Sequence, residues 1–239
     1  MNLEDESAEK FGVSELRDFT WKQLLDLYAC TECGRCQVAC PAHTTQKPLS
    51  PFRVIHRLRA QLMRDKGGLL ATGAGALKAT PVMPENVSED EVWACTTCGA
   101  CVQECPTFIE HVQKIVDLRR FLVLTESRFP AEIQPVFKNM EVNYNPWAIG
   151  YSSRADWAAD LAVPLAADRG TFDVLFWVGC AGSFDARGQK VSRAVVRLMQ
   201  KAGVDFAILG TEEMCCGETA RRMGNEYLAQ TLIQANIET

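Results

Sequence analysis

The chain has 239 residues, 47% hydrophobic and 23% charged, which is typical of an ordinary globular protein. Its 30 acidic and 25 basic residues give a net charge of -5, so nucleic acid is a poor candidate partner. The apolar runs are too short for a transmembrane helix, and the acidic start MNLEDESAEK lacks the apolar core of a signal peptide. Eleven cysteines, an odd number without an export signal, favour metal ligands over a disulfide framework.

The first half of the chain is predicted to be helical. Ser50 and Pro51 are typical of a helix start, and Ser88 begins a capping box. Hydrophobic periodicity places helices over residues 19–29, from 51 through 62, from 89 to 93, and over 111–127. The stretch 67–84, rich in glycine and proline, predicts a loop between the second and third of them.

Eight cysteines form two copies of the motif C-x-x-C-x-x-C-x-x-x-C-P, set 65 residues apart. The copies read CTECGRCQVACP and CTTCGACVQECP. This spacing is the ligand run of bacterial [4Fe–4S] clusters. Gly34 and Gly99 are predicted to let the chain pass close to the inorganic sulfides.

In this run the fourth cysteine begins a helix directed toward the other cluster. We therefore expect crossed ligand sets: Cys30, Cys33, Cys36 and Cys105 for cluster one, and Cys95, Cys98, Cys101 and Cys40 for cluster two. A pair of zinc sites is the alternative, but zinc favours separate C-x-x-C pairs without a third cysteine at the same step. The sequence predicts two [4Fe–4S] clusters.

The second half of the chain alternates strand and helix. Residues 128–170 are expected to be a linker arm, with Trp147 and Trp157 as packing anchors. Beyond it we expect a buried strand over 173–179, a helix over 189–202 with Val191, Val195, Leu198 and Met199 inward, a strand over 205–209, and a helix from 218. This order predicts parallel strands joined by a right-handed crossover, with Cys180 and Cys215 at one edge of the sheet.

The cluster loops, followed by Cys180 and the adjacent pair Cys215–Cys216, resemble the cysteine-rich (CCG) iron–sulfur oxidoreductases, which include the D-type heterodisulfide reductase proteins. The phrases VGCAGSFD and CCGETARRMGNEY are most similar to the membrane-associated branch that links electron-transfer flavoprotein to quinone. The resemblance implies that Cys180, Cys215 and Cys216 bind a third iron–sulfur cluster. The family motif continues with a C-x-x-C that this chain does not reach, so the expected third site is incomplete and the chain resembles a fragment. Three buried thiols without iron are the alternative.

We therefore predict an α+β protein in three parts. A helical, ferredoxin-like domain with two [4Fe–4S] clusters spans 1–127, a linker arm spans 128–170, and the N-terminal part of a CCG α/β domain with a small parallel sheet spans 171–239.

The resemblance implies an iron–sulfur electron-transfer subunit of an oxidoreductase, between a flavoprotein-type donor and a quinone or disulfide-type acceptor. Its partners would be redox subunits, such as electron-transfer flavoprotein and a membrane quinone-reactive subunit. Its place would be the cytoplasm or the cytoplasmic face of the cell membrane. The alternatives are a catalytic heterodisulfide reductase-like subunit that acts at the third cluster, and a cluster-bearing regulatory module. No catalytic residue is assigned.

The histidines and paired arginines point to no further site. His43, His56 and His111 share no ligand spacing and are predicted to be surface or packing residues. His111, six residues past Cys105, is placed to tune a cluster through a hydrogen bond. The pairs Arg119–Arg120 and Arg221–Arg222 are predicted to be solvated, where an acidic redox partner could use them.

Overall fold

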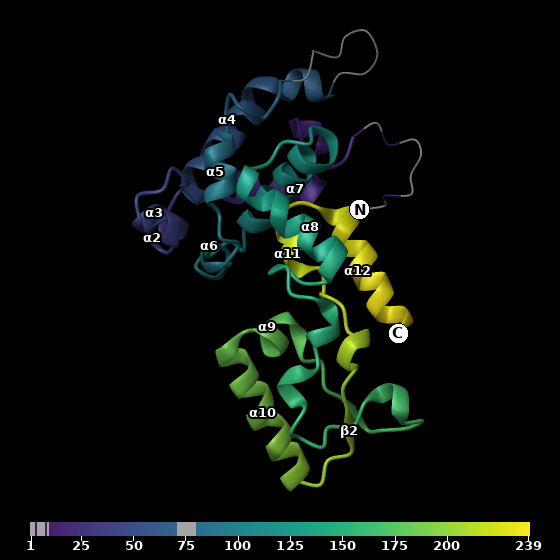
Figure 1. Ribbon diagram of the computed structural model, residues 1–239. Helices are drawn as coiled ribbons and strands as arrows, with labels where there is room; N and C mark the ends of the chain where they lie inside the picture. The colour runs from purple at the N-terminus through teal and green to yellow at the C-terminus, as the bar shows by residue number, and fades with distance from the viewer. Residues whose placement is uncertain (1–2, 4–7, 9, 71–79) are drawn as a thin grey trace. The chain divides into compact units, whose positions relative to one another are not determined.

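The computed structural model describes residues 3, 8, 10–70 and 80–239, with the side chains of 66–70 excepted (Figure 1). The chain divides into two compact units. The first comprises Met1–Phe129 with Arg222–Glu226, and the second comprises Pro130–Arg221 with Tyr227–Thr239. Among the described residues, no helix combines the length and apolar character needed to cross a bilayer.

Helices dominate the first unit. Its longer helices are α1 (Trp21–Ala29), α4 (Pro51–Leu70), α5 (Glu89–Ala94) and α7 (His111–Arg120), and a π-helical turn (Phe121–Thr125) continues α7. Its short elements are a 3-10 turn (Leu16–Asp18), α2 (Arg35–Val38), α3 (Pro41–Thr44) and α6 (Ala100–Gln103). The two expected helix starts are confirmed, because Ser50 and Ser88 each accept a backbone hydrogen bond of 3.2 Å from the residue three positions on. These caps fix where α4 and α5 begin.

Helix α4 is longer than the sequence predicted. The stretch 67–84 was expected to be a loop, but α4 continues through Gly67 and Gly68 to Leu70. A glycine inside a helix costs about 1 kcal/mol relative to alanine, and a helix already propagating can offset that cost. Residues 71–79 of the predicted loop lie outside the described part of the chain.

The core of the first unit joins the helices that flank the two cysteine loops. Leu27 of α1, Leu58 of α4, Val92 of α5 and Leu118 of α7 are all fully buried in one cluster. Full burial of such side chains stabilises the fold by about 1.5–3 kcal/mol each. The same cluster includes the last cysteine of each loop, so both loops are anchored to the core.

The second unit mixes helices with a two-stranded sheet. From Pro130 onward the chain forms α8 (Gln134–Asn143), β1 (Val174–Leu175), α9 (Gly179–Phe184), α10 (Ala186–Lys201), β2 (Phe206–Ala207), α11 (Glu218–Arg222) and α12 (Glu226–Glu238). Five 3-10 turns lie at Ala131–Ile133, Tyr151–Ser153, Asp156–Ala158, Ala166–Asp168 and Gly210–Glu212. The strands β1 and β2 run parallel, with Val174 opposite Phe206. The small parallel sheet is therefore confirmed.

Burial in the second unit differs from the expected pattern. Strand β1 is exposed, with Val174 at 41%, so the prediction of a buried strand was wrong. On α10 the predicted inward residues Val191 and Leu198 are exposed, and Val196 is the buried one. The helix turns Val196 toward a small core that also contains Phe206. A sheet of two short strands is too small to cover the whole face of α10 that the sequence predicted to be buried.

The two tryptophans of the 128–170 segment have different surroundings. Trp157 is 4% exposed and packs in the core of the second unit, as predicted for an anchor. Trp147 is 50% exposed, so its prediction as an anchor was wrong. It lies in a turn held by Asn145, whose side chain bonds the backbone of residues 143, 147 and 149. Local hydrogen bonds, and not packing of the indole, shape this turn.

Candidate iron–sulfur sites

The two cysteine loops adopt the same backbone conformation. The residue two positions after the first cysteine of each run, Glu32 or Thr97, has a left-handed φ of 59° or 55°. Gly34 and Gly99 follow with φ of 76° and 79° and begin the short helices α2 and α6. Such a φ favours glycine, and no protein atom lies within 4 Å of a Cβ built at either position. Close passage of the chain to inorganic sulfide stays a prediction.

The thiols of the two loops lie at matching depths. The third and fourth cysteine of each run are buried, the first is half-buried, and the second is exposed, namely Cys33 and Cys98. Both loops therefore hold most of their sulfur inside the protein and present one thiol to solvent. This pattern suits a cluster at the surface of a small domain.

Electrostatic interactions link thiols between the loops as well as within them. Burial raises the pKa of Cys36 to about 11, and the next causes are the charges of Cys30 and Cys105. Burial likewise raises the pKa of Cys101 to about 12, followed by the charges of Cys95 and Cys40. In each case the fourth cysteine of the other run is a close neighbour.

This donor set fits an iron–sulfur cluster. Several buried thiolates held together repel one another, and a cationic iron core would neutralise them. The eight loop cysteines are enough to supply the four thiolates that each of two [4Fe–4S] clusters needs, and their division between the clusters stays a prediction. In the described part of the chain, no three His, Cys, Asp or Glu side chains are grouped as ligands of a single metal ion.

The remaining three cysteines are brought together in the second unit. Cys180 lies in α9, and Cys215 and Cys216 follow the 3-10 turn at Gly210–Glu212. The Cys215 thiol is hydrogen-bonded to both Cys180 and Cys216, and these bonds raise its pKa. The same bonds lower the pKa of Cys180 to about 7 and that of Cys216 to about 6. The three thiols thus act on one another, but the described residues hold no group of three ligands for a single metal ion, so a cluster at this place stays a prediction.

Comparison with known protein families identifies both parts of the chain. Residues 29–109 match the family described as a 4Fe-4S dicluster domain, and residues 174–239 match the family described as a cysteine-rich domain. The chain thus consists of a 4Fe-4S dicluster domain followed by a cysteine-rich domain. The dicluster match favours two [4Fe–4S] clusters over zinc, and the family that the motifs resemble is confirmed.

Curated relatives span the same two domains. The chain is 46% identical to the "EtfAB:quinone oxidoreductase" of Syntrophomonas wolfei, over 98% of this chain and 36% of the relative. It is 39% identical to the "Probable membrane-anchored ferredoxin" of Chromohalobacter salexigens, over 100% and 37%. It is 30% identical to the D component of the "Dihydromethanophenazine:CoB--CoM heterodisulfide reductase" of Methanosarcina acetivorans, over 97% and 56%. The chain thus spans between about a third and just over half of the length of these relatives.

In the dicluster domain, backbone donors contact two of the predicted cluster ligands. The Thr97 N–H donates to the Cys95 Sγ over 3.4 Å, and the Ile109 N–H donates to the Cys105 Sγ over 3.3 Å. Such hydrogen bonds delocalise negative charge from sulfur and help to set the reduction potential of a cluster.

His111 is a packing residue of the dicluster domain. It is 6% exposed, and its Nδ1 lies 3.0 Å from the Ile109 carbonyl oxygen. Burial lowers its pKa to about 4. It lines a small cavity together with Cys95 and Cys101, close to the second loop. His56, in contrast, is half-exposed and stacks on Phe52.

One arginine pair contradicts the sequence prediction. Arg119 is 2% exposed and the Arg120 side chain is 12% exposed, so these residues are not solvated. Arg120 forms ion pairs with Asp117 and Glu226. The apolar period of α7 gave no signal for their burial, because Glu226 and the carbonyls that enclose Arg119 come from distant parts of the sequence. Arg221 and Arg222 are exposed, as predicted.

The cysteine-rich domain site contains a buried arginine that sequence analysis did not single out. Arg154 and Glu213 are each 1% exposed at the side chain and form an ion pair of 2.6 Å. The Arg154 Nη2 also lies 3.6 Å from the Cys180 Sγ, and its Nε is buried without a hydrogen-bond partner. Glu213 accepts the N–H groups of Val178 and Gly179, just before Cys180. The pair holds the two cysteine-bearing segments together, and a cationic side chain beside the thiols suits an anionic cluster.

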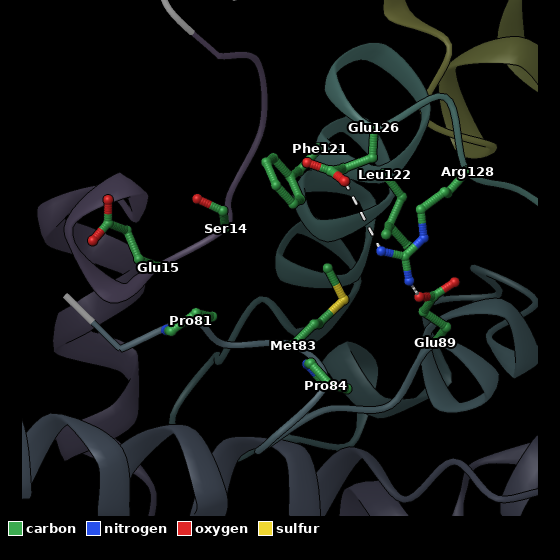
Figure 2. A pocket seen from close by; sticks show the side chains of 10 residues that line it. All are labelled: Ser14, Glu15, Pro81, Met83, Pro84, Glu89, Phe121, Leu122, Glu126 and Arg128. Carbon is green, nitrogen blue, oxygen red and sulfur yellow. Dashed lines mark ion pairs between the residues drawn. The ribbon is translucent and has the colours of Figure 1, made fainter.

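One cavity of the first unit has no cysteine in its lining. It has a volume of about 490 Å³, and Met83, Phe121 and Leu122 form part of its apolar wall (Figure 2). At its edge Arg128 forms ion pairs with Glu89 and Glu126, drawn as dashed lines in Figure 2. The lining therefore combines an apolar wall with an arginine that is already paired with two glutamates.

Proposed function

We propose that this chain is the iron–sulfur electron-transfer part of an oxidoreductase. It passes single electrons through two [4Fe–4S] clusters between a flavoprotein-type donor and a quinone or disulfide-type acceptor. The observation that carries the proposal is the pair of matching cysteine loops inside a dicluster domain. Clusters of this type act as one-electron carriers whose potential the protein sets by hydrogen bonds, charge and burial.

The proposed ligands follow the crossed pattern. Cluster one is held by Cys30, Cys33, Cys36 and Cys105, and cluster two by Cys95, Cys98, Cys101 and Cys40. The charge interactions of Cys36 with Cys105, and of Cys101 with Cys40, support this assignment. A crossed arrangement also places the two clusters near each other, which favours electron transfer between them.

The proposed partners and location come from the names of relatives. One relative is named for EtfAB and quinone, another for heterodisulfide, and a third as membrane-anchored. These names support electron-transfer flavoprotein as donor, a quinone-reactive membrane subunit as acceptor, and association with a membrane. A peripheral position on the cytoplasmic face of the membrane is part of the same proposal.

A catalytic role at the cysteine-rich domain is the second candidate. It is favoured by the hydrogen-bonded group of Cys180, Cys215 and Cys216 beside the buried Arg154. In this proposal the three thiolates bind a third iron–sulfur cluster together with at least one further ligand. The domain boundaries at 127 and 170 are part of the same proposal.

Electron paramagnetic resonance of the anaerobically purified chain tests both candidates. The carrier proposal predicts about eight iron atoms per chain and, after reduction, the spectrum of two interacting [4Fe–4S] clusters. An additional signal in the oxidised state, lost in a Cys215→Ser variant, would favour the third site. A reduced spectrum from a single isolated cluster would refute the carrier proposal.

A further inference from the structure

The guanidinium of Arg119 is enclosed next to the second cysteine loop. Its Nε and Nη2 donate to the Val92 carbonyl over 3.2 and 2.8 Å, and Nη2 also donates to the Cys95 carbonyl over 2.6 Å. Its Nη1 donates to the Arg222 carbonyl over 2.8 Å, within the same compact unit. The cation also lies 5.1 Å from the centre of the Trp93 ring. All of these oxygen acceptors are neutral.

This buried cation has no carboxylate partner among the described residues. Burial lowers the pKa of Arg119, and the one charge that opposes this effect is that of Cys95. Holding a charge away from water is costly unless an opposite charge lies near it. The opposite charge available to Arg119 is on the sulfur ligands of the second loop.

An arginine near the first loop, in contrast, has a carboxylate partner that the loop itself supplies. Glu32 of that loop forms an ion pair of 2.8 Å with Arg59 of α4, whose side chain is 34% exposed. The matching position of the second loop is Thr97, which has the same left-handed backbone but no charge. The first loop therefore neutralises Arg59 with its own carboxylate. Its second arginine, Arg35, also acts on Cys33, but it is exposed, so solvent screens its charge. The second loop places a buried, unneutralised arginine beside Cys95.

We propose that Arg119 is the counter-charge of the cluster bound at the second loop, and that it places the reduction potential of that cluster above that of the cluster at the first loop. Reduction adds one electron to a [4Fe–4S] core and makes it more negative, with no bond formed or broken. A buried positive charge stabilises the reduced form more than the oxidised form. The first electron that enters the protein therefore resides at the second loop. The proposal depends neither on the crossed ligand sets nor on the identity of donor and acceptor.

A redox titration followed by electron paramagnetic resonance tests the proposal with charge-removing and charge-keeping variants. Arg119→Gln should lower the equilibrium constant for reduction of the second-loop cluster at least about tenfold, which is about 59 mV for one electron. The other cluster should not change. Arg119→Lys keeps the charge and should shift the potential much less. Arg120→Gln is the matched control, because Arg120 lies on the same helix but pairs with Asp117 and Glu226.

Three results would overturn the proposal: no shift in Arg119→Gln, an equal shift in Arg119→Lys, or an equal shift in Arg120→Gln. If Arg119→Gln fails to retain its second cluster, the proposal is decided by the order in which the two clusters are reduced in the protein with Arg119 intact. Cys33→Ser or Cys98→Ser changes one solvent-exposed ligand and so marks the spectrum of one cluster at a time. First reduction of the first-loop cluster would then contradict the role of Arg119.

Discussion

Replacing Arg154 with methionine should destabilise the second unit more than any loss of a surface ion pair. The Arg154 side chain is 1% exposed, and its cation neutralises Glu213, which is equally buried. Glu213 in turn accepts the N–H groups of Val178 and Gly179 at 3.0 and 2.9 Å. Without Arg154, a carboxylate stays buried with two neutral donors and no counter-charge.

The size of the effect follows from these contacts. Removing one partner of a buried ion pair costs about 3–5 kcal/mol. The carbonyls of Tyr144 and Met214 also lose a long hydrogen bond of 3.3 Å each, which adds at most about 1 kcal/mol. Methionine keeps the apolar stem, so the cavity contribution is small. The sum, about 4 kcal/mol, is a large part of the roughly 5–15 kcal/mol by which a domain is stable.

Urea denaturation under argon, followed by far-UV circular dichroism and by the fluorescence of the five tryptophans, measures this loss. Arg193→Met is the matched control, because Arg193 pairs with Asp160 at the surface and should cost about 1 kcal/mol or less. In the double variant Arg154→Met/Glu213→Leu no charge stays buried, so it should be more stable than Arg154→Met alone. Equal losses in Arg154→Met and Arg193→Met, or additive losses in the double variant, would refute the reasoning.

Three further predictions concern the dicluster domain. Cys40→Ser should release the iron of the second-loop cluster, about half of the total, and loss of the first-loop cluster instead would contradict the crossed ligands. Gly99→Ala meets no protein atom but must adopt a φ of 79°, a strain of about 1–2 kcal/mol, so a chelator should remove the second cluster faster. An unchanged rate would show that the loop relaxes. Burial works to raise the pKa of Asp26, but hydrogen bonds from Lys114 and Lys22 outweigh it and hold that pKa below 3.8. A lowered carboxyl pKa adds stability above the unfolded pKa and loses it as pH falls through the folded pKa. The difference in urea midpoint between wild type and Asp26→Asn should therefore shrink below about pH 4, and a constant difference would contradict this.

The features that the sequence predicted correctly are those with local causes. The cysteine spacing is a ligand pattern within twelve residues, and the domain match agrees with the clusters it predicted. Ser50 and Ser88 cap helices through bonds three residues away, so their role is visible in the sequence. The strand, helix and strand after residue 173 likewise follow from local periodicity, and β1 and β2 pair in parallel.

The features that depended on tertiary structure are those whose partners lie far along the chain. Two adjacent arginines at 119 and 120 resemble a solvated pair, yet the carbonyls that enclose Arg119 come from residues 92, 95 and 222. Arg154 lies in a segment expected to be a linker arm, and its partner Glu213 is 59 residues away. The buried face of α10 was likewise set by what the core of the second unit could cover, so Val191 is exposed while Val196 is not. A charged or apolar side chain is buried wherever distant groups can satisfy or cover it, and periodicity within one helix contains no information about those groups.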